Sequence, residues 1–164
     1  MKLTELTKPN NRPKQIVLVC GNLASGKGHY AQTYYPDAEV IGVSSIVKEL
    51  TNFKTRSELS TTANLDNVIA NLLIERILNS PKDQVVIDGI RQITIMHKLQ
   101  RYFKDQIKDV IWLDVDEKDR RERFSKRNSG KDDMSFDKSV QTDKELGIGD
   151  VEDYIRKNHR VIPY

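Results

Sequence analysis

The sequence predicts an α/β fold in which a central, mostly parallel sheet is covered by helices on both faces. Three observations support this prediction. Short aliphatic runs alternate along the chain with longer segments of helical periodicity, as they do in βαβ units. The strongest runs are continuously apolar, which is typical of parallel strands buried on both faces. The first of them leads through a glycine-rich turn directly into a helical segment.

Each predicted strand is an aliphatic run bounded by turn residues, and the predicted helices place apolar residues three and four positions apart. The clearest helix covers residues 64–79, and Pro81 follows its end. Ser44 and Ser45 offer an N-cap to the helix after the second strand. In chain order, the sequence predicts strands at 15–20, 38–43, 84–87, 109–115 and around Val161, and helices at 27–35, 44–50, 64–79, 95–103, 117–127 and 135–145.

The 164 residues have the length of one domain, which we assign to residues 15–164, and the polar residues 1–14 read as a flexible N-terminal arm. Lys and Arg total 27 against 24 Asp and Glu, a net charge of +3 that identifies no partner by itself.

Cys20 is the only cysteine, which excludes an intramolecular disulfide and suits a reducing cytoplasm. No apolar run approaches the roughly 20 residues that cross a bilayer, so we expect a cytoplasmic protein with no membrane contact.

The turn after the first strand carries the most informative motif. Residues 21–27 (GNLASGK) satisfy the pattern G-x-x-x-x-G-K between a predicted strand and a predicted helix. Backbone amides of such a loop cradle phosphates, and Lys27 would bridge the β- and γ-phosphates of ATP. The alternative is an ordinary turn with a solvated lysine. The predicted ATP-binding residues are Gly21, Asn22, Ala24, Ser25, Gly26, Lys27, Gly28, His29 and Arg120.

Magnesium binding departs from the usual pattern at this loop. The Ser or Thr that normally follows the lysine and holds Mg²⁺ is replaced by Gly28 and then His29. Mg²⁺ must therefore be held through water, phosphate oxygens or another residue. Gly26-Lys27-Gly28 resembles the adenylate kinase branch of the P-loop kinases, which implies a three-layer P-loop kinase fold with a small lid. Thr commonly stands in that branch where this chain has His29, which either touches phosphate or is an ordinary surface histidine.

Asp88 ends the strand at 84–87, and its carboxylate should face the same crevice as Lys27. It can orient Mg²⁺ through water or accept the proton of an attacking hydroxyl, and the alternative is a cap of the next helix. Asp88-Gly89-Ile90-Arg91 also resembles a segment of nucleoside monophosphate and dephospho-coenzyme A kinase-like proteins, and this resemblance implies that Arg91 contacts the acceptor phosphate. An ordinary surface salt bridge is the alternative for Arg91.

Three further residues have a role suggested mainly by position. Ser44, Ser45 and Arg56 follow the second strand, where nucleotide kinases bind their acceptor. We name Ser44, Arg56 and Arg91 as predicted acceptor-binding residues. The serines can equally cap a helix, and Arg56 can equally be solvated.

Arg120, Arg123 and Arg127 are spaced by three and four residues, so they share one narrow face of a helix. An anion such as a triphosphate would relieve their repulsion, and they predict a lid over ATP spanning about residues 120–147. The alternative is a solvated face paired with neighbouring acidic residues of the same helix, which are Glu117, Asp119 and Glu122.

The segment 123–149 resembles a dephospho-coenzyme A kinase-related family of small P-loop proteins. The resemblance rests on Arg127, Asp132-Asp133, Phe136 and residues 143–149 (DKELGIG). It implies nucleotide phosphorylation without naming the acceptor. Asp143 and Glu145 either pair with the lid arginines or take part in the chemistry directly.

Three functions fit these residues. The first transfers the γ-phosphate of Mg-ATP to a (deoxy)nucleoside monophosphate by alignment and charge stabilisation. The second keeps the ATP site but phosphorylates a hydroxymethyl pyrimidine in phage-like DNA, with Asp88 as the general base. The third is a non-catalytic nucleotide-binding regulatory module, and no reading indicates an obligate protein partner. The predicted catalytic residues are Lys27, Asp88, Arg123 and Arg127.

Overall fold

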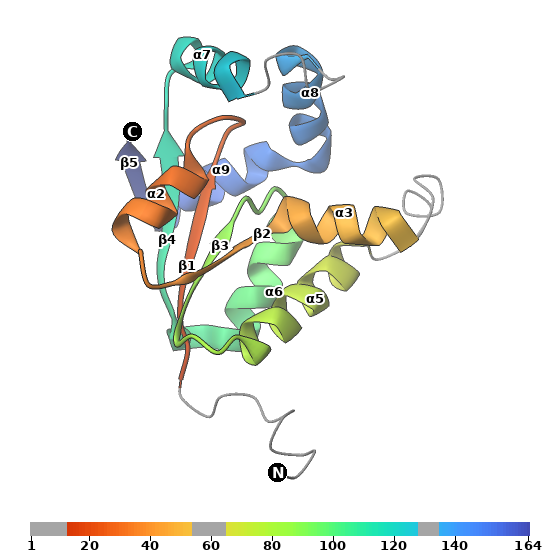
Figure 1. The fold of residues 1–164 in the computed structure, drawn as a ribbon, viewed down its shortest axis with the longest axis vertical. Coiled ribbons are helices and arrows are strands. Elements are labelled where there is room, and N and C mark those ends of the chain that lie inside the picture. Colours follow the sequence, from red (N-terminus) through yellow and green to blue (C-terminus); the bar gives the residue numbers. More distant parts are fainter. Residues whose placement is uncertain (1–12, 54–64, 128–134) are drawn as a thin grey trace.

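A computed structural model describes residues 13–53, 65–127 and 135–164 of the chain. The α/β prediction is confirmed, because the strands of these residues form one parallel sheet in the order β2-β3-β1-β4-β5 (Figure 1). The most central strand is therefore the one that leads into the glycine-rich turn. The strands are β1 (Gln15–Gly21), β2 (Glu39–Gly42), β3 (Gln84–Asp88), β4 (Ile107–Asp114) and β5 (Arg160–Pro163).

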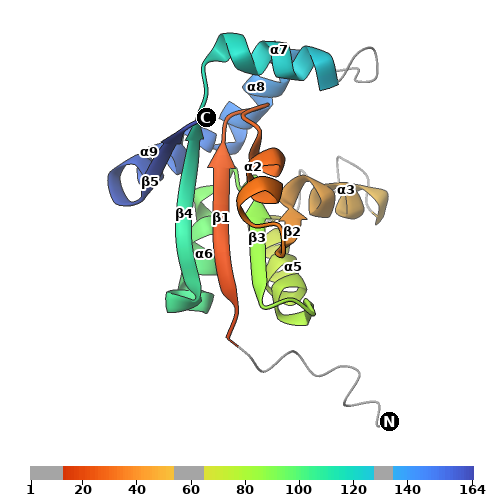
Figure 2. The same ribbon diagram turned by 60° about the vertical axis from the view of Figure 1, so that its left-hand side comes forward.

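Helices cover both faces of the sheet, but unequally (Figure 2). One face packs against α2, and the other packs against α3, α5, α6 and α9. Two more helices, α7 and α8, lie beyond the carboxyl ends of the strands. None of the helices described is long and apolar enough to span a bilayer. The bounds are α2 (Lys27–Tyr34), α3 (Val43–Phe53), α5 (Leu65–Asn79), α6 (Ile93–Phe103), η1 (Lys104–Gln106), α7 (Glu117–Arg127), α8 (Phe136–Leu146) and α9 (Ile148–Asn158).

The alternation of side chains along β1 produces the two cores. Ile16, Leu18 and Cys20 point into the larger core with the four helices, whereas Val17 and Val19 point into the smaller core with α2. All five are at most 3% exposed. The continuous apolar run in the sequence is thus explained by burial on both faces, which fixes the strand and the turn that follows it.

Two details differ from the sequence prediction. Helix α3 begins at Val43, so Ser44 and Ser45 lie in its first turn and do not form the predicted N-cap. Helix α9 was not predicted, because the glycines around Ile148 read as a loop. In the structure Gly147 has a φ of 102° and joins α8 to α9 directly.

Lys14 is a further correction, because the predicted flexible arm included it. Its side chain is only 2% exposed, and its Nζ donates hydrogen bonds of 2.7 Å to the carbonyl oxygens of Ser80 and Lys82. The chain is therefore tied down one residue before β1. The rest of the predicted arm, apart from Pro13, lies outside the described residues.

Candidate active site

A cavity of about 660 Å³ opens beyond the carboxyl ends of the central strands. This edge is where parallel α/β sheets bind ligands. Residues from the turn after β1, from the end of β3 and from α3 and α7 meet there, although they are far apart in the sequence. The lining residues are Leu23, Ala24, Gly26, Lys27, Gly28, His29, Ser44, Lys48, Asp88, Gly89, Arg91, Arg123 and Arg127.

The loop between β1 and α2 has the compact form that phosphate binding requires. The amide of Ser25 donates to the carbonyl of Asn22 at 3.1 Å, and Ser25 is fully buried. A Cβ on Gly21 would lie 2.4 Å from Ser25 Oγ, so a larger residue at position 21 would force the loop to move. The first turn of α2 follows at Lys27, and its free amides and dipole favour an anion at this point.

Lys27 reaches across this loop and makes no short hydrogen bond with another described residue. Its Nζ is 3.5 Å from the carbonyl oxygens of Gly21 and Asn22, which are long contacts. Burial lowers the pKa of Lys27, and the charge of Asp88 opposes this effect. An anion bound at the loop would therefore stabilise the charged form of this lysine.

Asp88 stands at the end of β3, where its backbone is in register with Val19 of β1. The chain then turns, and the amide of Gly89 donates to the carbonyl of Val19 at 3.0 Å. The N-cap of the following helix is Gln92, so the alternative role of Asp88 as a helix cap is wrong. Burial raises the pKa of Asp88, while the charges of Lys27, Arg91 and Arg127 lower it.

The described residues offer little for direct coordination of a metal. They contain no group of three or more His, Cys, Asp or Glu that could hold one. Asp88 is the carboxylate in the cavity lining. A Cβ on Gly28 would lie 3.7 Å from Asp88 Oδ2, which is the position of the missing hydroxyl side chain. A magnesium ion at this point would take most of its ligands from water and phosphate oxygens.

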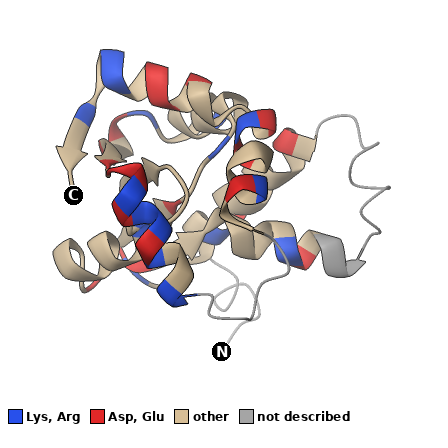
Figure 3. Cartoon of the chain, turned by 90° about the horizontal axis from the view of Figure 1, so that it is seen from above, with Lys and Arg blue, Asp and Glu red and all other residues tan. Residues whose placement is uncertain are grey.

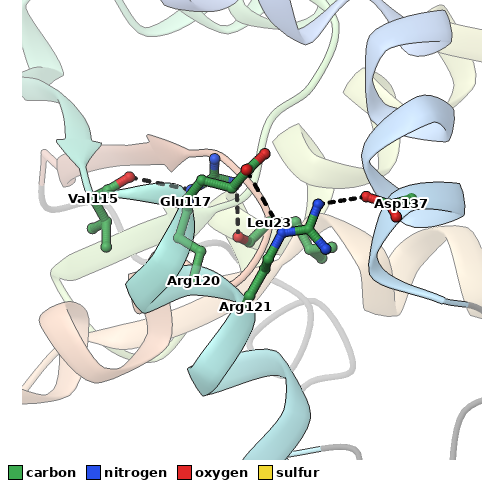
Figure 4. A network of polar contacts seen from close by, with 6 residues as sticks. All are labelled: Leu23, Val115, Glu117, Arg120, Arg121 and Asp137. Carbon is green, nitrogen blue, oxygen red and sulfur yellow. Dashed lines mark hydrogen bonds and ion pairs between the residues drawn. The ribbon is translucent and has the colours of Figure 1, made fainter.

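Helix α7 presents arginines with different partners (Figure 4). Arg120 is directed at the backbone, with its Nε 3.2 Å from the carbonyl of Val115 and its Nη1 3.5 Å from that of Leu23. Arg121 instead pairs with Glu117 at 3.6 Å and with Asp137 of α8 at 2.7 Å. Of these two arginines, Arg120 therefore contacts the phosphate loop and Arg121 fixes α7 to α8.

The other two predicted lid arginines line the cavity. Arg123 donates from Nη1 to the carbonyl of Ser25 at 3.0 Å and from Nη2 to the carbonyl of Tyr164 at 3.4 Å. Arg127 is close enough to lower the pKa of Asp88. Within the described chain, the ion pairs of α7 are made by Arg121, so the alternative of a fully paired, solvated arginine face does not describe this helix.

Tyr164 packs against three residues that line the cavity, Gly26, His29 and Arg123. Its ring lies 5.8 Å below the guanidinium of Arg123 and would be 3.2 Å from a Cβ on Gly26. Its hydroxyl contacts Nδ1 of His29. His29 is exposed and lines the cavity, so both readings of this histidine, phosphate contact and surface residue, remain compatible with its position.

Two of the predicted acceptor-binding residues, Ser44 and Arg91, line the cavity, and Lys48 lines it with them. Ser44 is exposed on the first turn of α3, and Arg91 follows the turn after β3. Arg56 lies outside the described residues. Lys48 was not predicted, because an exposed lysine in a helix carries no signal in the sequence.

Asp143 of α8 pairs with Arg91. It is 6% exposed, and its Oδ1 lies 3.1 Å from Nε of Arg91. Of the two alternatives for Asp143, pairing with a lid arginine is wrong, because the arginine that it pairs with follows β3. Glu145, which the same prediction included, is exposed and accepts a hydrogen bond of 3.4 Å from Gln141.

The charged side chains that line the cavity are mostly basic: Lys27, Lys48, Arg91, Arg123 and Arg127, with Asp88 as the carboxylate among the described lining residues. In the view onto the carboxyl ends of the strands, basic and acidic positions alternate along the helices (Figure 3). The basic residues that line the cavity are thus a local feature of the site.

Comparison with known sequences identifies the family. The sequence profile described as an AAA domain matches residues 16–144, which include the phosphate loop, Asp88, Arg91 and α7. The chain belongs to the AAA domain family. Two UPF0200 proteins are similar to this family member, one from Saccharolobus islandicus and one from Saccharolobus solfataricus. Each is 27% identical over 159 residues, which cover 88% of this chain and 84% of the relative.

Solved structures agree on the fold of this AAA domain protein. TT1252 from Thermus thermophilus has a TM-score of 0.57 and 13% identity, covering 93% of this chain and 90% of its own. Shikimate kinase from Bacteroides thetaiotaomicron has a TM-score of 0.57 and 14% identity, covering 90% and 85%. The predicted P-loop kinase fold is thereby confirmed.

Proposed function

We propose that this AAA domain protein transfers the γ-phosphate of ATP to a (deoxy)nucleoside monophosphate. The observation that carries the proposal is the single cavity shared by Lys27, Asp88 and Arg91. A lysine at the phosphate loop marks the donor, and an arginine on the opposite side marks an anionic acceptor. A protein that only bound nucleotide would have no use for the second group.

The residues present fit ATP and Mg²⁺. Ser25 Oγ is buried and has no hydrogen-bond partner among the described residues, which suits a loop completed by a ligand. The loop amides and Lys27 would hold the β- and γ-phosphates, Arg120 and Arg123 would contact the nucleotide, and Asp88 would hold the metal through water. When bound, Mg-ATP supplies the phosphoryl group and the metal neutralises part of its charge.

The protein's own groups then act by alignment and charge. Lys27 stabilises the charge on the transferred group, and Arg127 and Arg123 approach it from the helix that lies over the loop. Arg91, with Ser44 and Lys48 beside it, holds the acceptor phosphate in line. A phosphate oxygen attacks without a base, so Asp88 has its main role in fixing the metal and Lys27.

The test is transfer of labelled γ-phosphate from ATP and Mg²⁺ to a mixed pool of nucleoside and deoxynucleoside monophosphates. Oligonucleotides bearing hydroxymethyl pyrimidines are included, and the products are separated by size. We expect label in a nucleoside diphosphate. Label in the oligonucleotide would replace the proposed acceptor with a DNA base, and ATP binding without any labelled product would contradict transfer altogether.

A further inference from the structure

The ion pair between Arg91 and Asp143 joins two unequal partners. Asp143 is the one acidic residue that is buried within the described chain, whereas the Arg91 side chain is 33% exposed and lines the cavity. A carboxylate is rarely buried unless a cation compensates it. Asp143 is therefore the fixed member of the pair, and Arg91 is the member that remains available to a ligand.

The geometry of the contact leaves the arginine usable. The ion pair joins Oδ1 of Asp143 to Nε of Arg91 at 3.1 Å. A guanidinium held through Nε can direct its two terminal nitrogens at another oxyanion, and bidentate recognition of phosphate uses such a fork. The pair thus sets the direction of Arg91 in addition to compensating the buried charge.

Asp143 is itself held from both ends of its helix. At the start of α8, Asp137 pairs with Arg121 of α7 at 2.7 Å, and Phe136 packs edge-on against Phe124. At its end, Gly147 leads into α9, which is anchored in the larger core. Asp143, which holds Arg91, therefore lies on α8. The same helix packs against α7, which carries the predicted lid arginines.

We infer that Asp143 is a positioning residue for the acceptor: it orients Arg91 toward the phosphate group of a nucleoside monophosphate. The inference rests on the proposed function and extends it to a residue beyond the phosphate loop and the cavity lining. The orientation of Arg91 then depends on α8. Because α8 also pairs with α7 through Asp137, it connects the donor and acceptor sides of the cavity.

The key variant is Asp143→Asn, which keeps the size of the side chain and its ability to accept a hydrogen bond. Burial raises the pKa of Asp143, so a neutral amide is compatible with the fold and the variant should remain folded. We expect KM for the acceptor to rise about tenfold, as for other residues that orient a binding group, while KM for ATP stays near the wild-type value. The matched control is Glu145→Gln, an exposed residue of the same helix.

A double-mutant cycle separates positioning from general damage. In the background of Arg91→Ala, Asp143→Asn should have no further effect on KM for the acceptor, because the group that it orients is gone. Glu145→Gln should instead be without effect in either background. Additive losses from Asp143→Asn, an equal rise in KM for ATP or a lower Tm would overturn the inference.

The ion pair also has a readout that does not depend on turnover. The Nε–H resonance of Arg91, assigned by its loss in Arg91→Lys, should be visible in the wild-type protein and shift in Asp143→Asn. An unchanged resonance would overturn the inference even if the kinase activity is real. If the resonance shifts in Asp143→Asn but the wild-type protein phosphorylates no acceptor, the proposed function is refuted while the ion pair stands.

Discussion

The phosphate loop takes its shape from eight consecutive residues, 21–28, whereas the proposed acceptor side of the cavity draws its groups from three separate elements. The loop is determined by local geometry, such as the close approach of Ser25 to Gly21. The acceptor side instead depends on packing that brings Ser44, Arg91 and Asp143 together from α3, the turn after β3 and α8. Substitutions on the proposed acceptor side can therefore leave the local motif of the phosphate loop intact.

The largest expected effect lies on the donor side. Lys27→Ala should lower kcat by about 10³-fold, because a preorganised cation at the reacting phosphate is lost. The assay is γ-phosphate transfer at saturating ATP. The control is Lys118→Ala, an exposed lysine of α7 outside the cavity lining. Near-normal transfer by the Lys27 variant would break the assignment of the donor side.

Asp88 lies between the two sides, and its substitution should separate activity from stability. Asp88→Asn should lower kcat about 10²-fold because the metal and Lys27 lose their carboxylate. The folded protein holds the proton of this carboxyl more tightly than the unfolded chain does, because burial raises its pKa. The stability that the carboxyl contributes is present at low pH and is lost as pH rises through the folded pKa.

Above its raised pKa the ionised Asp88 therefore costs stability, and the amide should raise Tm by about 2–4 °C for each kcal/mol that is relieved. Wild-type activity should in turn fall as pH drops through the raised pKa, since the ionised form is required. Thermal unfolding with Asp119→Asn as the exposed control checks the first point. A lower Tm in Asp88→Asn would show that the carboxylate serves the fold more than the chemistry.

Two arginines of α7 offer a smaller and sharper contrast. Arg123 donates to the loop carbonyl of Ser25, whereas Arg121 pairs with Asp137 away from the cavity. Arg123→Ala should raise KM for ATP about tenfold, while Arg121→Ala should leave KM for ATP unchanged and lower stability only slightly, as loss of an exposed ion pair does. If both variants raised KM for ATP equally, the contribution of α7 to ATP binding would depend on the placement of the whole helix and not on the contact made by Arg123.

The smallest expected effect is a gain. Gly28→Ser should place a hydroxyl beside Asp88 and lower the Mg²⁺ concentration for half-maximal rate by about twofold, as in loops that carry a Ser or Thr there. Gly28→Ala adds the same Cβ without the hydroxyl and is the matched control. The same improvement in both variants would trace the gain to the backbone rather than to metal binding.

The sequence allowed the phosphate loop, β1, β3 and α7 to be predicted because each is encoded by neighbouring residues. The apolar run of β1 and the arginine spacing of α7 need no knowledge of distant contacts. Helix α9 escaped prediction because Gly147 and Gly149 obscured the spacing of Ile148, Val151 and Ile155.

The pairing of Asp143 with Arg91 could not be predicted for a different reason. Both residues were singled out, but their separation along the chain leaves many possible partners. The choice among partners is made by the packing of α8 against α7 and of α9 against the core. The residues next to Asp143 and Arg91 in the sequence do not indicate how α8 and α9 pack.

Gly147 ends one helix and begins the next with a single left-handed residue, and its φ of 102° is strained for any side chain. A saturation mutagenesis screen scored on activity should therefore find position 147 as intolerant as the glycines of the phosphate loop. A screen scored on ATP binding alone should find it far more permissive. Substitution of Gly147 would then impair phosphoryl transfer while leaving ATP binding intact, although the residue lies far from the phosphate loop.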